Sequence, residues 1–300
     1  EKHVDELAYA HGGTVGDGQL KQQAEDFIVN ERLTFTPSGE GEHEFVYVQK
    51  KGLNTDEVLK KLAVHAGVTR RSVSYAGMKD KHAVTKQWFS VHLPGRDDSI
   101  KIKRSTRHLK KLKRGVIQFN EFEIVISQLT VDHALLQQRI EQIKMFGVPN
   151  YFMQQRFGYL CQNLDRAYGL FSRGEKIKNK QLKGLLLSSA RSFLFNQVLS
   201  ERVKAENWDK VLPGDAFMLS GTRQYFTDEA NSTTTHTRLM EHDIHPSGPL
   251  FGVNDKVVSA SVEQLEDTVF KANSVFCTGL LKEKVDSARR ALRVVPTDFK

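Results

Sequence analysis

The stretch Gly77-Met78-Lys79-Asp80-Lys81-His82-Ala83-Val84-Thr85 places one aspartate between two lysines, and it connects two segments with the pattern of β-strands. Residues 73–76 alternate apolar and polar side chains, residues 88–93 are rich in aromatic and β-branched side chains, and Gly77 favours a turn between them. A nearby lysine ammonium favours the ionised form of a carboxylate. The same local pattern is also typical of a solvated surface aspartate, so two interpretations stay open at this point.

The first 146 residues predict a mixed α+β unit. Alternation predicts strands near residues 27–29 and 45–48, and later strands near 73–76, 87–93 and 116–126, the last interrupted at Asn120. Asn54, with Glu57 three residues on, predicts the start of a helix that ends at Gly67. A second helix is expected from about residue 132 to 145, closed by Gly147.

From Gly147 onward the pattern becomes mainly helical. Apolar residues at helical spacing predict a long helix over residues 183–205. A short strand-like element is expected over residues 211–219, where Pro213-Gly214-Asp215 indicates a turn. Residues 245–252 are so rich in proline and glycine that we expect an irregular loop.

The net charge of +8 is concentrated in one segment. Residues 99–120 contain eight basic side chains and no acidic one, while the rest of the chain balances 36 basic against 36 acidic residues. Such a patch predicts a polyanion partner, with a solvated hairpin as the alternative. The candidate RNA-backbone contacts are Lys101, Lys103, Arg104, Arg107, Lys110, Lys111, Lys113 and Arg114.

The sequence does not indicate a membrane segment, a signal peptide, a metal site or a phosphate-binding loop. The sequence has no apolar run long enough to cross a bilayer, and residues 1–5 have no signal-peptide character, which favours the cytoplasm and no membrane partner. Cys161 and Cys277 lack the spacing of a zinc ribbon and are expected to be plain thiols. His236, His242 and His245 share no helix face, so no metal is predicted. Residues 39–42 carry acids where a phosphate loop would bind its anion.

Motifs along almost the whole chain resemble the TruD family of tRNA pseudouridine synthases. The matching segments are Lys21 with residues 25–31, then 39–43, 77–88, 120–122, 147–152, 155–158, 189–192, 194–197 and 288–291. The resemblance implies an α+β fold: a pseudouridine synthase catalytic domain with a mixed, largely antiparallel sheet, and an inserted, mainly helical α+β domain. The expected boundaries are residues 1–146 for the catalytic domain, closed by residues from about 294 onward, and 147–293 for the insertion.

The resemblance also implies a reaction and its residues. It implies that uridine-13 of tRNA is isomerised to pseudouridine without a cofactor. The sequence predicts no metal, and no obligatory protein partner is evident in it. Asp80 matches the essential aspartate, which either attacks ribose C1′ or removes a ribose proton, and Lys21 matches its basic partner. Phe27, Asn120 and Phe122 match substrate contacts.

Each of these residues also has an ordinary structural interpretation. Lys21 could be a surface lysine, Phe27 could pack in a core, and Asn120 could mark a β-bulge. Phe119 stands where the family tends to have glycine. The alternative function is a non-catalytic RNA-binding protein on the same scaffold. Family members continue beyond the position of Lys300 into closing strands, and the chain does not begin with methionine, so we expect a trimmed chain.

Overall fold

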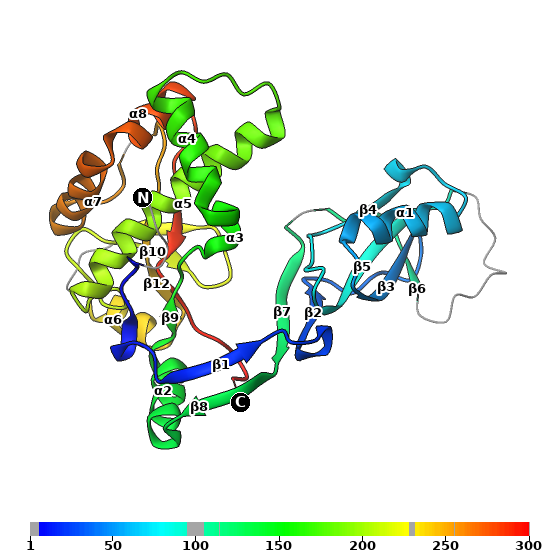
Figure 1. The fold of residues 1–300 in the computed structure, drawn as a ribbon, viewed down its shortest axis with the longest axis horizontal. Helices are drawn as coiled ribbons and strands as arrows, with labels where there is room; N and C mark the ends of the chain where they lie inside the picture. The colour runs from blue at the N-terminus through cyan, green and yellow to red at the C-terminus, as the bar shows by residue number, and fades with distance from the viewer. Residues whose placement is uncertain (1–5, 95–104, 114, 228–231, 255, 300) are drawn as a thin grey trace. The chain divides into compact units, whose positions relative to one another are not determined.

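The computed structural model describes residues 6–94, 105–113, 115–227, 232–254 and 256–299 (Figure 1). The chain divides into two compact units, which we call the sheet unit, Gly16–Val131, and the helical unit, Glu1–Val15 with Asp132–Lys300. Each is described by itself below. The boundary expected near residue 147 stays a prediction.

The sheet unit carries eight strands and one α-helix in its described part. These are β1 (Gly16–Leu20), β2 (Phe27–Leu33), β3 (His43–Lys51), α1 (Thr55–His65), β4 (Val73–Tyr75), β5 (Val84–His92), β6 (Ser105–His108), β7 (Ile117–Ile124) and β8 (Ile126–Val131). Six strands form one sheet in the order β6-β3-β5-β2-β7, with β4 paired to β5. Strands β2 and β5 run parallel, and the other pairs in this sheet are antiparallel. The mixed, largely antiparallel sheet that we expected is therefore confirmed.

Helix α1 begins as the sequence predicts and covers part of this sheet. The side chain of Asn54 accepts from the backbone of the first turn, and the backbone nitrogen of Asn54 donates to Glu57 Oε2 at 2.6 Å. Gly67, just beyond the helix, has a φ of 66°, in the left-handed region that glycine adopts without a steric cost. The apolar face of α1, centred on Val58 and Leu59, packs against a cluster that includes Phe89, which is fully buried.

Strand β7 differs from the expected interruption at Asn120. Asn120 lies inside the strand and is paired with Glu31 of β2. The register shift occurs next to this pair instead, where Arg32 lies opposite Phe119 and Leu33 opposite Ile117, leaving Gln118 as the extra residue. The polar side chain at 120 therefore does not break the ladder.

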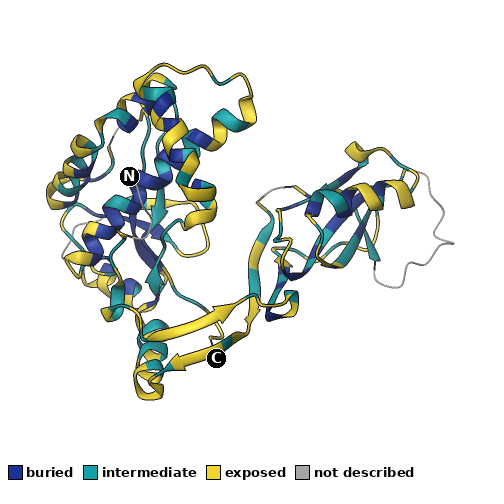
Figure 2. Ribbon diagram, in the orientation of Figure 1, coloured by how far each residue is buried: buried dark blue, intermediate teal, exposed yellow. Residues whose placement is uncertain are grey.

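The helical unit contains most of the remaining elements. The described ones are α2 (His133–Phe146), β9 (Val148–Pro149), α3 (Gln154–Phe157), α4 (Gln162–Ser172), α5 (Lys180–Lys204), β10 (Ala216–Leu219), β11 (Tyr225–Thr227), α6 (Thr233–Met240), β12 (Ile244–Leu250), α7 (Ala260–Ala272), α8 (Ser274–Lys282), β13 (Ala288–Ala291) and β14 (Arg293–Val294). Four of its strands form an antiparallel sheet in the order β11-β10-β12-β13. Figure 2 shows the buried residues concentrated along α5 and this sheet.

The expectation of an irregular loop at residues 245–252 is wrong. Residues 244–250 form β12, an inner strand between β10 and β13. Gly248 is required for packing, since a Cβ atom there would come within 2.7 Å of Leu292 and 2.9 Å of Phe195. Pro246 still accepts a hydrogen bond through its carbonyl oxygen, from Leu292 N at 2.8 Å. Composition predicted a loop, but packing against α5 and pairing on both sides stabilise a strand.

The long helix α5 is the main support of the helical unit. It was expected over residues 183–205 and is observed at Lys180–Lys204. Near its end the buried Arg202 pairs with Asp215, with Nη1 and Oδ1 2.7 Å apart, which ties the helix to the loop before β10. In the described part of the chain, no helix combines the length and apolar character needed to cross a bilayer.

Candidate active site

The parallel pairing of β2 with β5 brings two distant segments to one end of the sheet. Ile28 lies opposite Val84, so the chain enters both strands at the same end. Lys21 precedes β2 by a few residues, and Asp80 precedes β5 in the same way. The strand arrangement therefore places the loop with Asp80 beside the segment with Lys21.

Lys21 and Asp80 form an ion pair. Lys21 Nζ lies 3.2 Å from Asp80 Oδ2, and the two side chains are 30% and 39% exposed. The backbone of Lys21 has a φ of 55°, an uncommon conformation for a residue with a side chain. The same ammonium lies 3.8 Å from the centre of the Phe27 ring. Both side chains are partly exposed to solvent, so a substrate can reach the carboxylate.

A second lysine, which the sequence interpretation missed, holds the backbone beneath this pair. Lys50 is 3% exposed, and its ammonium donates to the carbonyl oxygens of Asp80 at 2.6 Å, Leu53 at 2.8 Å and Lys79 at 3.4 Å. Burial lowers the pKa of Lys50, and the nearby charge of Asp80 opposes this effect. Lys50 therefore fixes the main chain of the residue whose side chain pairs with Lys21.

The remainder of the loop is also anchored by buried polar groups. Lys79 Nζ lies 2.6 Å from Glu31 Oε2, and the two side chains are 7% and 0% exposed. The backbone nitrogen of Lys79 donates to Thr55 Oγ1 at 2.9 Å, and Gln87 Nε2 donates to the carbonyl of Gly77 at 3.0 Å. Glu31 in β2 and Gln87 in β5 are polar residues at buried strand positions. Because a buried polar side chain needs a hydrogen-bond partner, these two residues were the sequence signal for this network.

Two aromatic rings lie next to the ion pair, and an amide lies two residues from one of them in β7. Phe27 and Phe122 have ring centroids 5.9 Å apart at 63°, an edge-to-face contact, and Phe122 is 58% exposed. Asn120 has a buried Oδ1 without a hydrogen-bond partner among the described residues. Phe119 and Met78 are exposed as well. The structure thus connects Asp80, Lys21, Phe27 and Phe122 through successive contacts, and it places Asn120 in β7 opposite Glu31 of β2.

The basic segment is only partly described. Lys101, Lys103, Arg104 and Arg114 lie outside the described residues. Lys110, Lys111 and Lys113 are exposed and flank the buried Leu112, whose backbone nitrogen donates to Ser90 Oγ at 3.0 Å. Arg107 Nε lies 2.8 Å from Glu44 Oε2, and both side chains are largely buried, so its charge is already neutralised within the sheet. Arg107 is therefore a weaker candidate for a phosphate contact than the three lysines.

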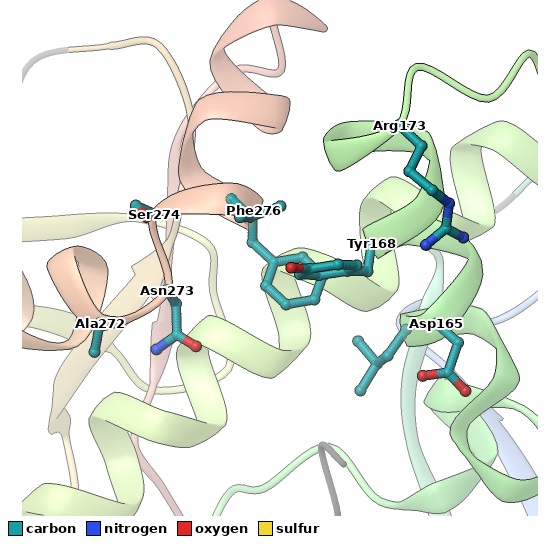
Figure 3. A pocket seen from close by; sticks show the side chains of 9 residues that line it. Asp165, Tyr168, Arg173, Ala272, Asn273, Ser274 and Phe276 are labelled. Carbon is teal, nitrogen blue, oxygen red and sulfur yellow. The ribbon is translucent and has the colours of Figure 1, made fainter.

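The helical unit has a separate open cavity of about 500 Å³ (Figure 3). Tyr168 and Phe276 meet there edge to face with centroids 6.0 Å apart, and Asp165 and Asn273 add polar groups. Arg173 at its rim is paired with Glu175, with Nη2 and Oε1 2.7 Å apart. None of the candidate catalytic residues lines this cavity.

No metal centre is indicated in the described part of the chain, where no group of three or more histidine, cysteine or acidic side chains could hold an ion. Cys161 and Cys277 form no disulfide bond in the described part of the chain. His245 is buried, and Arg293 Nε donates to its Nδ1 at 2.8 Å. Burial, together with the charge of Arg293, lowers the pKa of His245 to about 4. Its burial and its hydrogen bond with Arg293 indicate that His245 has a structural role.

Comparison with known proteins gives a consistent result. A family model described as tRNA pseudouridine synthase D (TruD) matches residues 4–167 and 159–300. The tRNA pseudouridine synthase D of Colwellia psychrerythraea is 39% identical over 302 residues, which cover 98% of this chain and 82% of that protein. The same-named protein of Methylococcus capsulatus is 40% identical over 304 residues, 98% of this chain and 86% of that protein.

A solved structure has the same fold. The crystal structure of a putative tRNA pseudouridine synthase D (TruD) from Methanosarcina mazei superimposes with a TM-score of 0.71 and covers 96% of this chain and 86% of that one. At 20% sequence identity this match bears on the fold alone. The family model and the relatives, which span nearly the whole chain, decide the family: the chain belongs to the TruD family of tRNA pseudouridine synthases.

Proposed function

We propose that this protein is a tRNA pseudouridine synthase in which Asp80 is the catalytic carboxylate and Lys21 its cationic partner. The observation that carries the proposal is the ion pair at 3.2 Å, on a loop whose backbone is held by the buried Lys50. An RNA-binding protein without a reaction to catalyse has no use for a carboxylate fixed in this way. The names of the relatives support the same activity.

The reaction requires one ionised carboxylate and no change of oxidation state. The C1′–N1 bond of uridine breaks, the base turns, and a C1′–C5 bond forms; N1 gains a proton and C5 loses one. Asp80 acts at the ribose, either as a nucleophile at C1′ or as the base that removes a ribose proton. The ammonium of Lys21 pairs with the carboxylate of Asp80 and orients it in both routes.

The neighbouring aromatic side chains can support a uracil base that has been extruded from the stacked bases of the RNA. Phe122 is exposed and meets Phe27 edge to face, so the two rings offer an apolar support beside the carboxylate. The amide of Asn120 can both donate to and accept from the edge of uracil, and its Oδ1 has no other partner among the described residues. These three residues are the proposed substrate contacts.

The position of the target within tRNA comes from the family resemblance, which supports uridine-13. Among the charged groups of the sheet unit, the exposed Lys110, Lys111 and Lys113 are the proposed contacts to the RNA backbone. The same role is proposed for the other basic residues of that segment, with Arg107 the weakest candidate because of its pairing with Glu44.

The test is the release of tritium from C5 of labelled uridine in a tRNA transcript. Wild type should release tritium, and Asp80→Asn should release none above background while binding tRNA within a few-fold of wild type, because the change removes charge but almost no volume. Reverse transcription of carbodiimide-treated product should locate the modified base at position 13. A wild-type protein that binds tRNA without releasing tritium would identify a non-catalytic RNA-binding protein and refute the proposal.

A further inference from the structure

Two arginines from distant segments of the helical unit lie against one aromatic ring. The guanidinium carbon of Arg156, in α3, is 5.0 Å from the centre of the Phe152 ring, and that of Arg290, in β13, is 4.1 Å from it. The two carbons therefore lie within about 9 Å of each other, the sum of these distances. Neither arginine has a part in the proposed chemistry.

The ring and both arginines are fixed by uncharged groups. The backbone nitrogen of Phe152 donates to Asn196 Oδ1 at 2.9 Å, and Asn196 Nδ2 donates to the carbonyl of Phe152 at 2.7 Å. Arg290 Nη2 donates to Asn150 Oδ1 at 2.5 Å, and Arg156 Nη1 donates to Ser188 Oγ at 3.1 Å. The geometry is thus built in advance of any ligand.

The positive charges of Arg156 and Arg290 are not balanced by a nearby carboxylate of a described residue. Within the described ranges, no carboxylate lies in ion-pair distance of Arg156 or Arg290. Other buried arginines of the unit do have one: Arg202 is paired with Asp215 at 2.7 Å, and Arg289 with Glu266 at 2.8 Å.

The environment of Arg290 reflects this imbalance. Burial, and then the charge of Arg156, lowers the pKa of Arg290 to about 10, so it remains a cation at neutral pH. Its Nε is buried and has no hydrogen-bond partner among the described residues. Two cations held close together in a half-buried setting repel each other, and an anion that contacts both would remove this cost.

We propose that Arg156 and Arg290 form a phosphate-binding site for the backbone of the RNA substrate. The planar guanidinium fork matches phosphate oxygens in a bidentate geometry, and both groups can contact one phosphate or two successive ones. The choice of RNA as the source of phosphate rests on the proposed function. The site would hold the RNA on the helical unit, through residues that take no part in the reaction itself.

The experiment measures tRNA affinity against salt concentration in an Asp80→Asn background, which prevents turnover. Arg156→Gln and Arg290→Gln should each weaken binding about tenfold and flatten the slope of log K against log salt by roughly 0.7 to 0.9. The matched control is Arg238→Gln: Arg238 also lies over an aromatic ring, 5.2 Å from the centre of Phe226, but it is paired with Asp243 at 2.6 Å. The control should leave both affinity and slope unchanged.

Two further measurements separate phosphate binding from a packing role. Arg290→Lys keeps the charge and should retain the wild-type salt slope, whereas a residue needed only for stacking on Phe152 would lose as much with lysine as with glutamine. In otherwise wild-type protein, Arg156→Gln should raise KM and leave the single-turnover rate at saturating tRNA unchanged. If wild type turns over tRNA normally while both glutamine variants keep the wild-type affinity and slope, the phosphate site is disproved and the proposed function stands. If wild type neither binds nor modifies tRNA, the proposed function has failed.

Discussion

The ammonium of Lys50 lies 2.6 Å from the backbone carbonyl oxygen of Asp80. A buried cation from β3 therefore holds the main chain of Asp80, while the half-buried cation of Lys21 pairs with its side chain. The carboxylate is positioned from two sides by two lysines that are far apart in sequence. This division of roles leads to separate predictions for the two lysines.

Lys50→Met should lower kcat by roughly 10- to 100-fold with tRNA affinity within a few-fold of wild type. Loss of a charged donor worth about 1.5–3 kcal/mol frees the carbonyl of Asp80 and lets the loop move. Single-turnover pseudouridine formation and filter binding measure the two quantities. Lys51→Met is the control, because the neighbouring Lys51 is exposed and pairs with Glu25 instead. Equal losses in both variants would contradict a specific role for Lys50.

Lys21→Met should reduce kcat sharply, whereas Lys81→Met should have little effect. Lys81 is adjacent to Asp80 in sequence and is exposed, but the ion pair that the structure gives Asp80 is with Lys21, 59 residues away. Tritium release from C5 at saturating tRNA is the measurement. Lys21→Arg should recover part of the rate because it restores a cation. If Lys21→Met is as fast as wild type, Lys21 is a surface residue with no role in the reaction.

Replacement of Lys110, Lys111 and Lys113 by glutamine should flatten the salt slope of tRNA binding by about two, at roughly 0.7 per phosphate contact. Circular dichroism should show the same secondary structure, since all three side chains are exposed. Substitution of Lys60, Lys61 and Lys271, which are also exposed, provides a control of equal charge. A wild-type slope in the first variant would show that the segment faces away from the RNA.

The stability of the helical unit should fall between pH 6.5 and 4. His245 has its pKa lowered to about 4 in the folded chain, so the unfolded chain binds more protons in this range and is favoured as the pH drops. The loss should be on the order of 3 kcal/mol and should level off below pH 4. Urea unfolding at several pH values measures it.

His245→Asn tests the cause of that pH dependence. Asparagine can still accept from Arg293 but does not titrate, so the dependence in this range should largely disappear. His236→Asn, at an exposed position on α6, should leave it unchanged. An identical pH profile for wild type and His245→Asn would exclude this histidine as the source.

Local sequence patterns predicted the elements whose stability is mainly local. Asn54 and Glu57 predicted the start of α1, because a capping box is a contact between residues three apart in sequence. Strand β12 was missed because its stability comes from pairing on both sides and from packing of Gly248 against Phe195 and Leu292, which no short window of sequence contains.

The candidate site shows the same limit. Asp80 and Lys21 were predicted as catalytic residues from family resemblance. Their local sequence pattern alone is common on protein surfaces and did not predict this role. Lys50 and Glu31 escaped notice because their partners, the carbonyl of Asp80 and the ammonium of Lys79, are reached only after the strands have paired. A buried lysine is recognised by its partners in space, and sequence spacing does not give those.

The parallel pairing of β2 with β5 has a consequence for the order of folding. Parallel neighbours need a long crossover, and here residues 28–30 pair with residues 84–86. Closing so long a loop costs chain entropy before the contacts that repay it exist. During synthesis, the ion pair of Lys21 with Asp80 therefore forms only after β5 has left the ribosome and paired with β2. A nascent chain that has exposed Lys21 but not β5 lacks a carboxylate positioned to react with RNA.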